Sequence, residues 1–334
     1  MFSRSGRPVG LHSNYTVVTE LIYVALSSFG ATDSSPLEKL KASGHPFRIH
    51  TSGKRITSKE LIQNATEATV ILAGIETYDS DLLAKLPSLK CISRCGVGVD
   101  TIDLATAKLR GVVVANTPHI PTQAVAELAL AMILSLCRQL RPQANLMQAR
   151  RWERLTANLL GGRTVGIIGL GRIGQKVAKL CRAFDARVLA VDPLVKDEIA
   201  NHLDLQLVHQ SQLLAESDIV CLHASKGTGE AALIGPVEFS QMKRGAILVN
   251  LARGGMVDEP ALVDALKSGQ ISGAGLDVFH TEPYTGPLCD FDNVILTPHT
   301  ATLTIETRTA MEVQCVSNAL DFLAGNLPAE NRAI

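Results

Sequence analysis

A glycine-rich segment in the middle of the chain constrains the fold more than any other feature. The apolar run VGII (165–168) is followed by Gly-Leu-Gly-Arg-Ile-Gly and then by the helical pattern QKVAKLCRAF (175–184). Glycines at 169, 171 and 174 suit a strand that turns sharply into a helix: the first permits the turn, the second lets backbone approach a ligand, and the third lets the helix pack closely. The sequence therefore predicts a doubly wound α/β fold around a parallel sheet.

Strand-like and helical segments alternate along both halves of the chain from about residue 21. Nearly continuous apolar strands that alternate with helices are typical of a parallel sheet covered on both faces. The expected strands of the first half are LIYVAL, FRIHT, ATVILAG, LKCISRCG and GVVVANTP, with helices around 35–43, 58–65, 79–85 and 103–109. Six strands follow in the second half: VGIIG, ARVLAVD, DIVCLHA, AILVNLARGG, GAGLDVF and NVILTPH. We expect Ser58 and Asp79 to cap two of the helices.

A long helical segment from about Thr122 to Trp152 separates the two series. Its first half is apolar nearly all round, which favours burial on several sides. Its second half is basic and contains Pro142, which should kink or split the helix. Because 334 residues exceed what one hydrophobic core usually serves, we expect two domains with a boundary near residue 118.

The charge balance and the cysteines narrow the classes of function. Lys plus Arg and Asp plus Glu both number 32, so nothing favours nucleic acid or an anionic membrane as a partner. No segment approaches the roughly 20 apolar residues of a membrane-spanning helix. The seven cysteines lack the spacing of zinc ligands, so we expect no metal site and a reducing, cytoplasmic setting. The first 20 residues are expected to be a surface extension rather than a targeting segment.

The glycine-rich turn predicts a dinucleotide site. The backbone amides of Arg172 and Ile173 would face a pyrophosphate at the positive end of the helix. The next strand ends at Asp192, 18 residues after Gly174, where a carboxylate can accept hydrogen bonds from ribose hydroxyls and would repel a 2′-phosphate. This arrangement favours NAD over NADP.

Polar side chains follow several of the second-half strands. In open α/β sheets ligands bind beyond the carboxyl ends of the strands, so these side chains should converge on one site. A histidine, an arginine and acids beside a nicotinamide suit the oxidation of a hydroxy acid. The residues concerned are Asp192, His223, Arg253, Asp277, Glu282 and His299.

The chain resembles the D-isomer-specific 2-hydroxyacid dehydrogenases over nearly all of its length after about residue 20. Among the members of this family it is most similar to phosphoglycerate dehydrogenases without a C-terminal regulatory domain. The motifs that carry the resemblance are RCGVGVDTID, ANTP followed by AVAELALAMIL, VGIIGLGRIG, VNLARGGMVDE, GAGLDVFHTEP and VILTPHTA.

The resemblance implies a role for each candidate site residue. Arg253 would bind the substrate carboxylate with its guanidinium fork, His299 would act as general acid and base, and Glu282 would be the carboxylate partner of His299. Asp277 would contact the nicotinamide end, although it could equally cap the strand. The other implied cofactor contacts are Ala224, through its backbone alone, and Leu251 and Ala252.

The resemblance also implies how the domains are used. A flavodoxin-like substrate domain would comprise residues 1–118 and 302–334, and an NAD-binding Rossmann domain residues 119–301, with the active-site cleft between them. Backbone amides of Gly96, Val97 and Gly98 would bind the substrate carboxylate opposite Arg253. We further expect a homodimer that uses the apolar helix beginning near Ala124, because this helix would be over-exposed in a monomer.

One departure from the family pattern concerns the substrate. Some phosphoglycerate dehydrogenases carry an arginine for the substrate phosphate where this chain has Ala73, and Glu76 lies close by. An acid would repel a phosphate, although Lys54 and Arg55 could compensate. The alternatives that remain open are a hydroxypyruvate or glyoxylate reductase and, from another class, an NAD-sensing corepressor-like binding protein.

Overall fold

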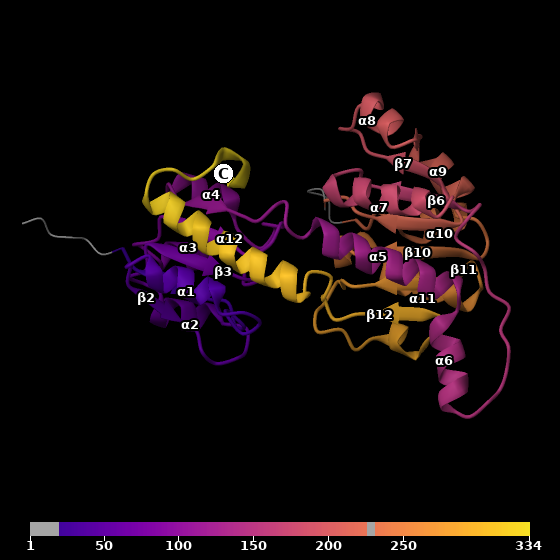
Figure 1. Cartoon of the computed structure of the whole chain (residues 1–334), viewed down its shortest axis with the longest axis horizontal. Coiled ribbons are helices and arrows are strands. Elements are labelled where there is room, and N and C mark those ends of the chain that lie inside the picture. The colour runs from indigo at the N-terminus through magenta and orange to yellow at the C-terminus, as the bar shows by residue number, and fades with distance from the viewer. Residues whose placement is uncertain (1–19, 226–230) are drawn as a thin grey trace, which may run out of the picture. The chain divides into compact units, whose positions relative to one another are not determined.

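The computed structural model describes residues 20–225 and 231–334 (Figure 1). The chain divides into two compact units, which we call the N-terminal unit (Met1–Thr117 with Glu312–Ile334) and the central unit (Pro118–Met311). The borders between the units fall at 117/118 and 311/312, whereas the sequence placed the domain borders at 118/119 and 301/302. Each unit is built on one parallel sheet with helices, which confirms the predicted α/β fold.

The sheet of the N-terminal unit has five parallel strands in the order β2-β1-β3-β4-β5, a flavodoxin-like arrangement. Its strands are β1 (Ile22–Val24), β2 (Phe47–Ile49), β3 (Val70–Ala73), β4 (Cys91–Arg94) and β5 (Val113–Ala115). Its helices are α1 (Ser35–Ala42), α2 (Ser58–Asn64), α3 (Ser80–Ala84), α4 (Leu104–Leu109) and most of α12 (Ile305–Leu323).

Two helix starts in this unit test the predicted caps. The Asp79 side chain accepts a hydrogen bond from the Leu82 amide at 2.8 Å and caps α3, as predicted. The cap of α2 is Thr57 rather than Ser58, so this prediction was wrong by one residue. Thr57 and Glu60 form a reciprocal capping box, which requires an acid three residues after the cap, and Ser58 has Leu61 at that position.

The C-terminal segment completes the N-terminal unit. Arg332 forms an antiparallel bridge with Ala115, and the Ala333 amide donates to the carbonyl of Val114 at 2.8 Å. On α12, the buried Glu312 carboxylate accepts a hydrogen bond from the Gly30 amide at 2.8 Å. Segments that are far apart in the sequence therefore belong to one compact unit.

The sheet of the central unit has seven parallel strands in the order β12-β11-β10-β9-β6-β7-β8. Strands β7 and β8 extend the sheet on one side of β6, and β9 to β12 extend it on the other side, as in Rossmann folds. The strands are β6 (Thr164–Ile168), β7 (Arg187–Val191), β8 (Gln206–Leu207), β9 (Ile219–Leu222), β10 (Ala246–Asn250), β11 (Ile271–Leu276) and β12 (Val294–Leu296). The sequence predicted six of these strands and missed β8, because this edge strand has two residues and no apolar run.

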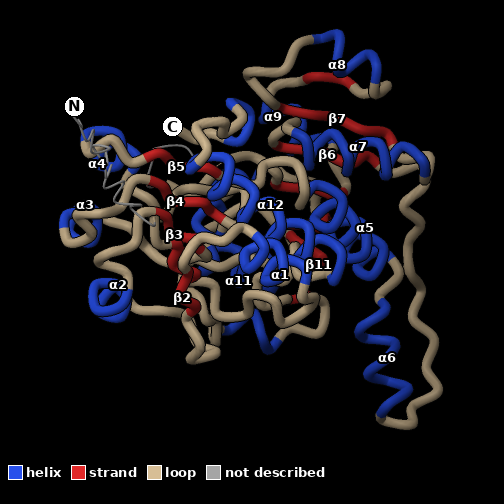
Figure 2. Tube along the Cα trace, turned by 60° about the vertical axis from the view of Figure 1, so that its left-hand side comes forward, coloured by secondary structure: helices blue, strands red, loops and turns tan. Residues whose placement is uncertain are grey.

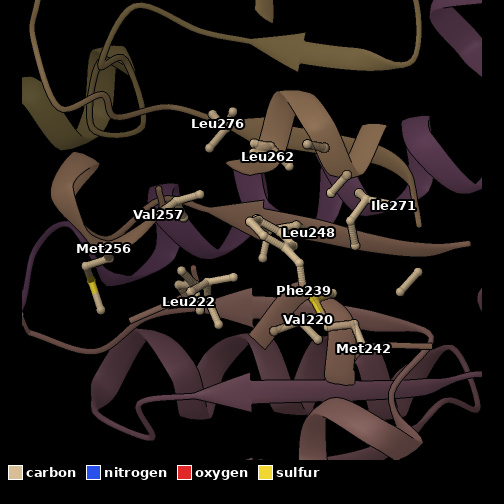
Figure 3. Close-up of a cluster of buried hydrophobic side chains, with 14 of the residues drawn as sticks. Val220, Leu222, Phe239, Met242, Leu248, Met256, Val257, Leu262, Ile271 and Leu276 are labelled. Atoms are coloured by element: carbon tan, nitrogen blue, oxygen red, sulfur yellow. The ribbon is translucent and has the colours of Figure 1, made fainter. Parts of the chain in front are cut away.

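Helices cover both faces of the central sheet. Figure 3 shows part of the core on one face, where Leu222 and Leu248 from the strands meet Phe239 of α10 and Leu262 of α11. On the other face α5 packs against α7. The helices of this unit are α5 (Thr122–Cys137), α6 (Leu140–Gln148), α7 (Arg172–Ala183), α8 (Asp197–His202), α9 (Gln210–Glu216), α10 (Pro236–Gln241) and α11 (Glu259–Lys267).

The long helical segment is split into α5 and α6, which meet at a bend of 64°. The break lies at Gln139, where φ is +48°, rather than at Pro142 itself. Pro142 has no amide to donate to the Arg138 carbonyl four residues earlier, so the helix must end before it and Pro142 falls in the first turn of α6. The Gln143 side chain donates to that carbonyl instead, at 2.6 Å.

The apolar surface of α5 is covered within the central unit, so the expected over-exposure of this helix was wrong. Seven of its residues are buried, among them Met132 and Ile133, because the helix lies on the sheet close to Gly275 of β11. Exposed apolar side chains occur instead on α6 and the residues that follow it. Within the described residues no single helix is long and apolar enough to cross a bilayer, and α5 and α6 reach that length only as a bent pair.

Candidate active site

The glycine-rich turn lies at the switch point of the central sheet, between β6 and α7. Gly169 has φ +96°, and a Cβ there would lie 2.3 Å from the amide nitrogen of Ala224 after β9. A Cβ at Gly174 would lie 2.1 Å from the Gly169 carbonyl oxygen. Gly171, in contrast, has no atom within 4 Å of its Cβ position. The fold itself thus requires Gly169 and Gly174, while Gly171 borders open space that a ligand can occupy.

The surroundings of this turn suit a dinucleotide. Gly171 is the N-cap of α7 and has no side chain that could accept hydrogen bonds from the first-turn amides of Arg172 and Ile173. Asp192 follows β7, and its carboxylate accepts hydrogen bonds from the amides of Leu170 and Leu194 at 2.8 and 2.9 Å. An acid therefore lies beside the glycine-rich turn, where the sequence predicted a residue that binds the ribose of the cofactor. These residues fit NAD.

A half-buried histidine lies next to the same turn. His223 follows β9, and its Nε2 atom is buried without a hydrogen-bond partner among the described residues. Burial lowers the pKa of His223 to about 4, so the imidazole is neutral at physiological pH.

Arg253 is held by the loop that follows β10. The buried Asn250 side chain accepts from the Ala252 amide at 3.0 Å and donates to the Arg253 carbonyl at 2.9 Å, which forms a tight turn. A Cβ at Gly254 would lie 1.9 Å from the Phe279 carbonyl, so this loop is pressed against the loop after β11. Leu251 and Ala252 are buried, and Arg253 is half-buried.

His299 and Glu282 form a pair on the neighbouring loops. Nδ1 of His299 lies 2.9 Å from Oε2 of Glu282 and 3.2 Å from Oε1. An ionised carboxylate only accepts hydrogen bonds, so Nδ1 carries the proton of the pair and Nε2 is left without a partner in the described part of the chain. His299 is 47% exposed, and Oε1 of Glu282 is fixed by the Phe279 amide at 3.1 Å. The pair is therefore oriented and accessible.

Asp277 shapes the turn that carries His299. Its buried carboxylate accepts hydrogen bonds from the Thr297 hydroxyl at 2.5 Å and from the Thr300 and Ala301 amides at 2.7 and 3.0 Å. Its carbonyl accepts from the His299 amide at 2.9 Å. His299 has φ +55°, a conformation that histidine adopts rarely and that these contacts stabilise. The Asp277 carboxylate thus caps the turn after the neighbouring strand β12 rather than the end of its own strand, and a contact with nicotinamide stays a prediction.

The structure therefore places Arg253, Glu282 and His299 after β10, β11 and β12, which are neighbours in the central sheet, and brings Glu282 and His299 into contact. The sequence missed Asn250 as the residue that positions Arg253. Its signal was an asparagine at a strand end, a residue type that commonly organises the following turn. Within the described part of the chain no cluster of three His, Cys, Asp or Glu side chains is arranged to hold a metal ion.

The candidate substrate loop belongs to the N-terminal unit and follows β4. The Gly96 amide donates to the Arg94 carbonyl at 3.0 Å, and the Gly96 carbonyl accepts from the Thr117 amide at 3.0 Å. The amides of Val97 and Gly98 have no hydrogen-bond partner among the described residues. The predicted anion contact of the Gly96 amide is thus opposed by its engagement with Arg94, and an anion role for this loop rests on Val97 and Gly98.

The central unit thus combines a Rossmann-type sheet, a glycine-rich turn with an adjacent acid at its switch point, and Arg253, Glu282 and His299 after neighbouring strands. Residues 130–301 match the family described as D-isomer specific 2-hydroxyacid dehydrogenase, NAD binding domain. The chain belongs to this family, as its motifs predicted.

The names of similar proteins agree with membership of this family. The chain is 37% identical to D-3-phosphoglycerate dehydrogenase of Archaeoglobus fulgidus over 300 residues, 88% of this chain and 56% of the relative. It is 34% identical to glyoxylate reductase of Korarchaeum cryptofilum over 281 residues, 81% of this chain and 85% of the relative. The chain thus spans about half the length of the phosphoglycerate dehydrogenases it matches.

A solved structure extends the likeness to the fold. D-lactate dehydrogenase from Aquifex aeolicus, in complex with NAD and lactic acid, superposes with a TM-score of 0.83 at 29% identity. The match covers 94% of this chain and 99% of that protein.

Proposed function

We propose that this protein is an NAD-dependent dehydrogenase that interconverts a small D-2-hydroxy acid and the corresponding 2-oxo acid. The observation that carries the proposal is the His299–Glu282 pair at 2.9 Å, next to the strand end that carries Arg253. Family membership and relatives named glyoxylate reductase and D-lactate dehydrogenase support the same reaction class.

Each member of this set has a defined task. Arg253 binds the substrate carboxylate through two parallel N–H···O bonds and so fixes C2. Nε2 of His299 removes the proton of the C2 hydroxyl during oxidation and returns it during reduction. Glu282 keeps the proton on Nδ1 and stabilises the imidazolium that forms. When bound, NAD supplies the hydride acceptor.

The cofactor is held by the central unit. We propose that the open side of Gly171 and the amides of Arg172 and Ile173 bind the pyrophosphate, and that Asp192 binds the ribose hydroxyls. Ala224, Leu251, Ala252 and Asp277 are the remaining cofactor contacts that we expect. The negative charge of Asp192 disfavours a 2′-phosphate, which supports NAD rather than NADP.

The substrate-binding loop and the domain roles belong to the same proposal. The amides of Val97 and Gly98 are expected to bind the substrate carboxylate, which makes the N-terminal unit the substrate domain. The relatives include both phosphoglycerate dehydrogenases and glyoxylate reductases, so these comparisons leave open which group is attached to C2 of the substrate.

We also propose a homodimer in a reducing, cytoplasmic compartment. We call α6 and the residues after it, 140–159, the α6 arm; it extends away from the sheet of the central unit (Figure 2). None of the α6 residues is buried, and Met147, Trp152 and Leu159 are 54%, 79% and 72% exposed. Such a surface suits contact with a second copy. The seven cysteines are all free thiols, which fits a reducing setting.

The direct test is oxidation of NADH with glyoxylate, pyruvate, hydroxypyruvate and phosphohydroxypyruvate, with NADPH as the control cofactor. We expect turnover of at least one acid with NADH and at least tenfold slower turnover with NADPH. Tight NADH binding without turnover of any acid would contradict the proposal and favour an NAD-sensing binding protein.

A further inference from the structure

Glu282 lies on a loop of the central unit that is closed on itself. The aromatic rings of Phe279 and Tyr284 stack, with their centres 4.5 Å apart and 17° between their planes. The Phe279 amide donates to Oε1 of Glu282 at 3.1 Å, and the Tyr284 hydroxyl accepts from the Leu288 amide at 3.3 Å. Residues 279–284 therefore form a compact loop, and the position of Glu282 depends on where this loop is anchored.

The anchor is the peptide group that joins Phe279 and His280. A Cβ at Gly254 would lie 1.9 Å from the carbonyl carbon and oxygen of Phe279 and 2.5 Å from the nitrogen of His280. The residue after Arg253 thus packs directly on this peptide group. The nitrogen of the same group donates a hydrogen bond to Oε1 of Glu259 at 2.7 Å. One peptide group is therefore held both by the loop that carries Arg253 and by the start of α11.

The carboxylate of Glu259 is not used to cap its own helix. Asp258 is the N-cap of α11, and its side chain accepts a hydrogen bond from the Ala261 amide at 3.0 Å. Glu259 is the first residue of the helix and half-buried, and its side chain bonds a residue 21 positions further along the chain. A hydrogen bond from an amide to an ionised carboxylate is stronger than one between neutral groups. This contact therefore fixes the loop after β11.

We propose that Glu259 is a positioning residue, whose hydrogen bond to the His280 amide orients the loop of Glu282 and so keeps Glu282 in contact with His299. The inference rests on the function proposed above, in which Nε2 of His299 transfers the proton. Glu259 has no task of its own in that chemistry and acts through Glu282. Without its hydrogen bond the loop still packs on Gly254 but loses its fixed orientation, and the 2.9 Å contact between Glu282 and His299 forms for less of the time.

Two conservative variants separate this role from a contribution of charge to the helix. Glu259→Gln removes the negative charge but keeps a side-chain oxygen that accepts a hydrogen bond at the same reach. Glu259→Asp keeps the charge at the start of α11, but its side chain is one methylene group shorter and no longer reaches the His280 amide. Positioning predicts an active Gln variant and an impaired Asp variant. Stabilisation of the helix by a negative charge in its first turn predicts the reverse.

The measurement is kcat and KM with NADH and whichever of the four acids named above is turned over fastest. In Glu259→Asp and Glu259→Ala, kcat should fall roughly tenfold or more while KM for NADH stays within about twofold, because a small displacement of a reacting group is costly. Glu259→Gln should keep about half of kcat or more. Glu198→Ala is the matched control and should keep full kcat, because Glu198 is an exposed first-turn glutamate of α8.

A double-mutant cycle tests whether Glu259 acts through Glu282. Glu282→Ala leaves His299 without its carboxylate, so adding Glu259→Ala in this background should change kcat by less than about twofold. A further tenfold loss in the double variant would overturn the inference. So would a kcat for Glu259→Asp within twofold of the unmodified protein, or an equal loss in Glu259→Gln and Glu259→Asp. Circular dichroism establishes that each variant is folded, and the Asp and Gln variants decide if Glu259→Ala does not fold.

Absence of turnover by the unmodified protein with every acid would contradict the proposed function, and amide hydrogen exchange measured by NMR then decides the positioning role. The Phe279 amide bonds Glu282 and not Glu259. If Glu259 orients the loop, the Phe279 amide should exchange at least tenfold faster in Glu259→Asp than in the unmodified protein. Faster exchange of the His280 amide alone would show that Glu259 holds only its direct partner, and the inference would fail.

Discussion

His299 is fixed by two carboxylates that act on different parts of the residue. Glu282 holds the ring through Nδ1, and Asp277 holds the backbone turn on which the ring is mounted. In the proposed reaction, the first contact would set which nitrogen is available for proton transfer, and the second would set where that nitrogen lies. Both would be needed because proton transfer requires a donor and an acceptor within hydrogen-bond distance.

Replacing His299 by alanine should therefore remove proton transfer and leave cofactor binding in place. We expect kcat to fall by roughly 100-fold or more in His299→Ala, with the Kd for NADH nearly unchanged. Steady-state kinetics and a fluorescence titration with NADH measure the two quantities. His280→Ala, at an exposed histidine of the same region, is the control and should keep full activity. Equal turnover in His299→Ala would exclude His299 from the mechanism.

His223 links stability to pH. Its pKa is lowered from 6.5 to about 4 by burial, so between these pH values the unfolded chain binds a proton that the folded chain does not. The free energy of unfolding should therefore be highest above pH 6.5, fall as the pH falls towards 4, and lose at most about 3 kcal/mol from this group. Urea unfolding at pH 4 to 7 measures this slope. His223→Phe should make the slope shallower, and an identical slope in the variant would contradict the assignment.

The sequence predicted where the candidate site residues lie better than the residues that position them. The positions of Arg253, Glu282 and His299 could be predicted because side chains after parallel strands meet at one edge of a sheet, while their catalytic roles stay a proposal. The turn-forming role of Asn250 and the capping contacts of Asp277 depend on hydrogen bonds to backbone amides, whose directions follow from the three-dimensional path of the loops. For the same reason the engagement of the Gly96 amide could not be foreseen.

At the level of elements, the turn between β6 and α7 separates the demands of folding from those of the proposed cofactor binding. Gly174 meets backbone of the same turn, whereas Gly171 has ordinary φ of −66° and free space around its Cβ position. In this proposal the same residue type would serve folding at position 174 and cofactor binding at position 171.

Two alanine variants distinguish these purposes. Gly174→Ala should lower the free energy of unfolding by about 2 kcal/mol or more, because its Cβ would overlap a carbonyl oxygen. Gly171→Ala should leave the thermal unfolding temperature unchanged but raise the Kd for NADH at least tenfold. Differential scanning fluorimetry and NADH titration report the two effects. Unaltered NADH binding in Gly171→Ala would show that the pyrophosphate lies elsewhere.

Elements with strong apolar periodicity were predictable, and marginal ones were not. The five strands of the N-terminal unit and six of the central unit appear where apolar runs predict them. The edge strand β8 has two residues and is held by pairing with β7, which leaves no local signal. The break between α5 and α6 was expected at Pro142 but falls earlier, because proline disturbs the turn that precedes it.

At the level of the whole molecule, the α6 arm should decide the number of chains per particle. We expect the protein to sediment as a dimer at micromolar concentration, and the double variant Met147→Glu with Trp152→Glu to sediment as a monomer. Analytical ultracentrifugation makes the measurement. Leu194→Glu, which charges a 90% exposed leucine of the central unit outside the arm, should leave the dimer intact. A monomeric unmodified protein would contradict the prediction.

The pairing of residues 332 and 333 with β5 affects the order in which the two units can fold during synthesis. The central unit is one continuous segment, so all of its strands are available as soon as residue 311 has left the ribosome. The N-terminal unit is synthesised first but lacks α12 and the segment beside β5 until residues 312–334 have followed. Nascent chains should therefore complete the central unit before the N-terminal unit, whose five-stranded sheet keeps part of its apolar surface uncovered until residues 312–334 have been made.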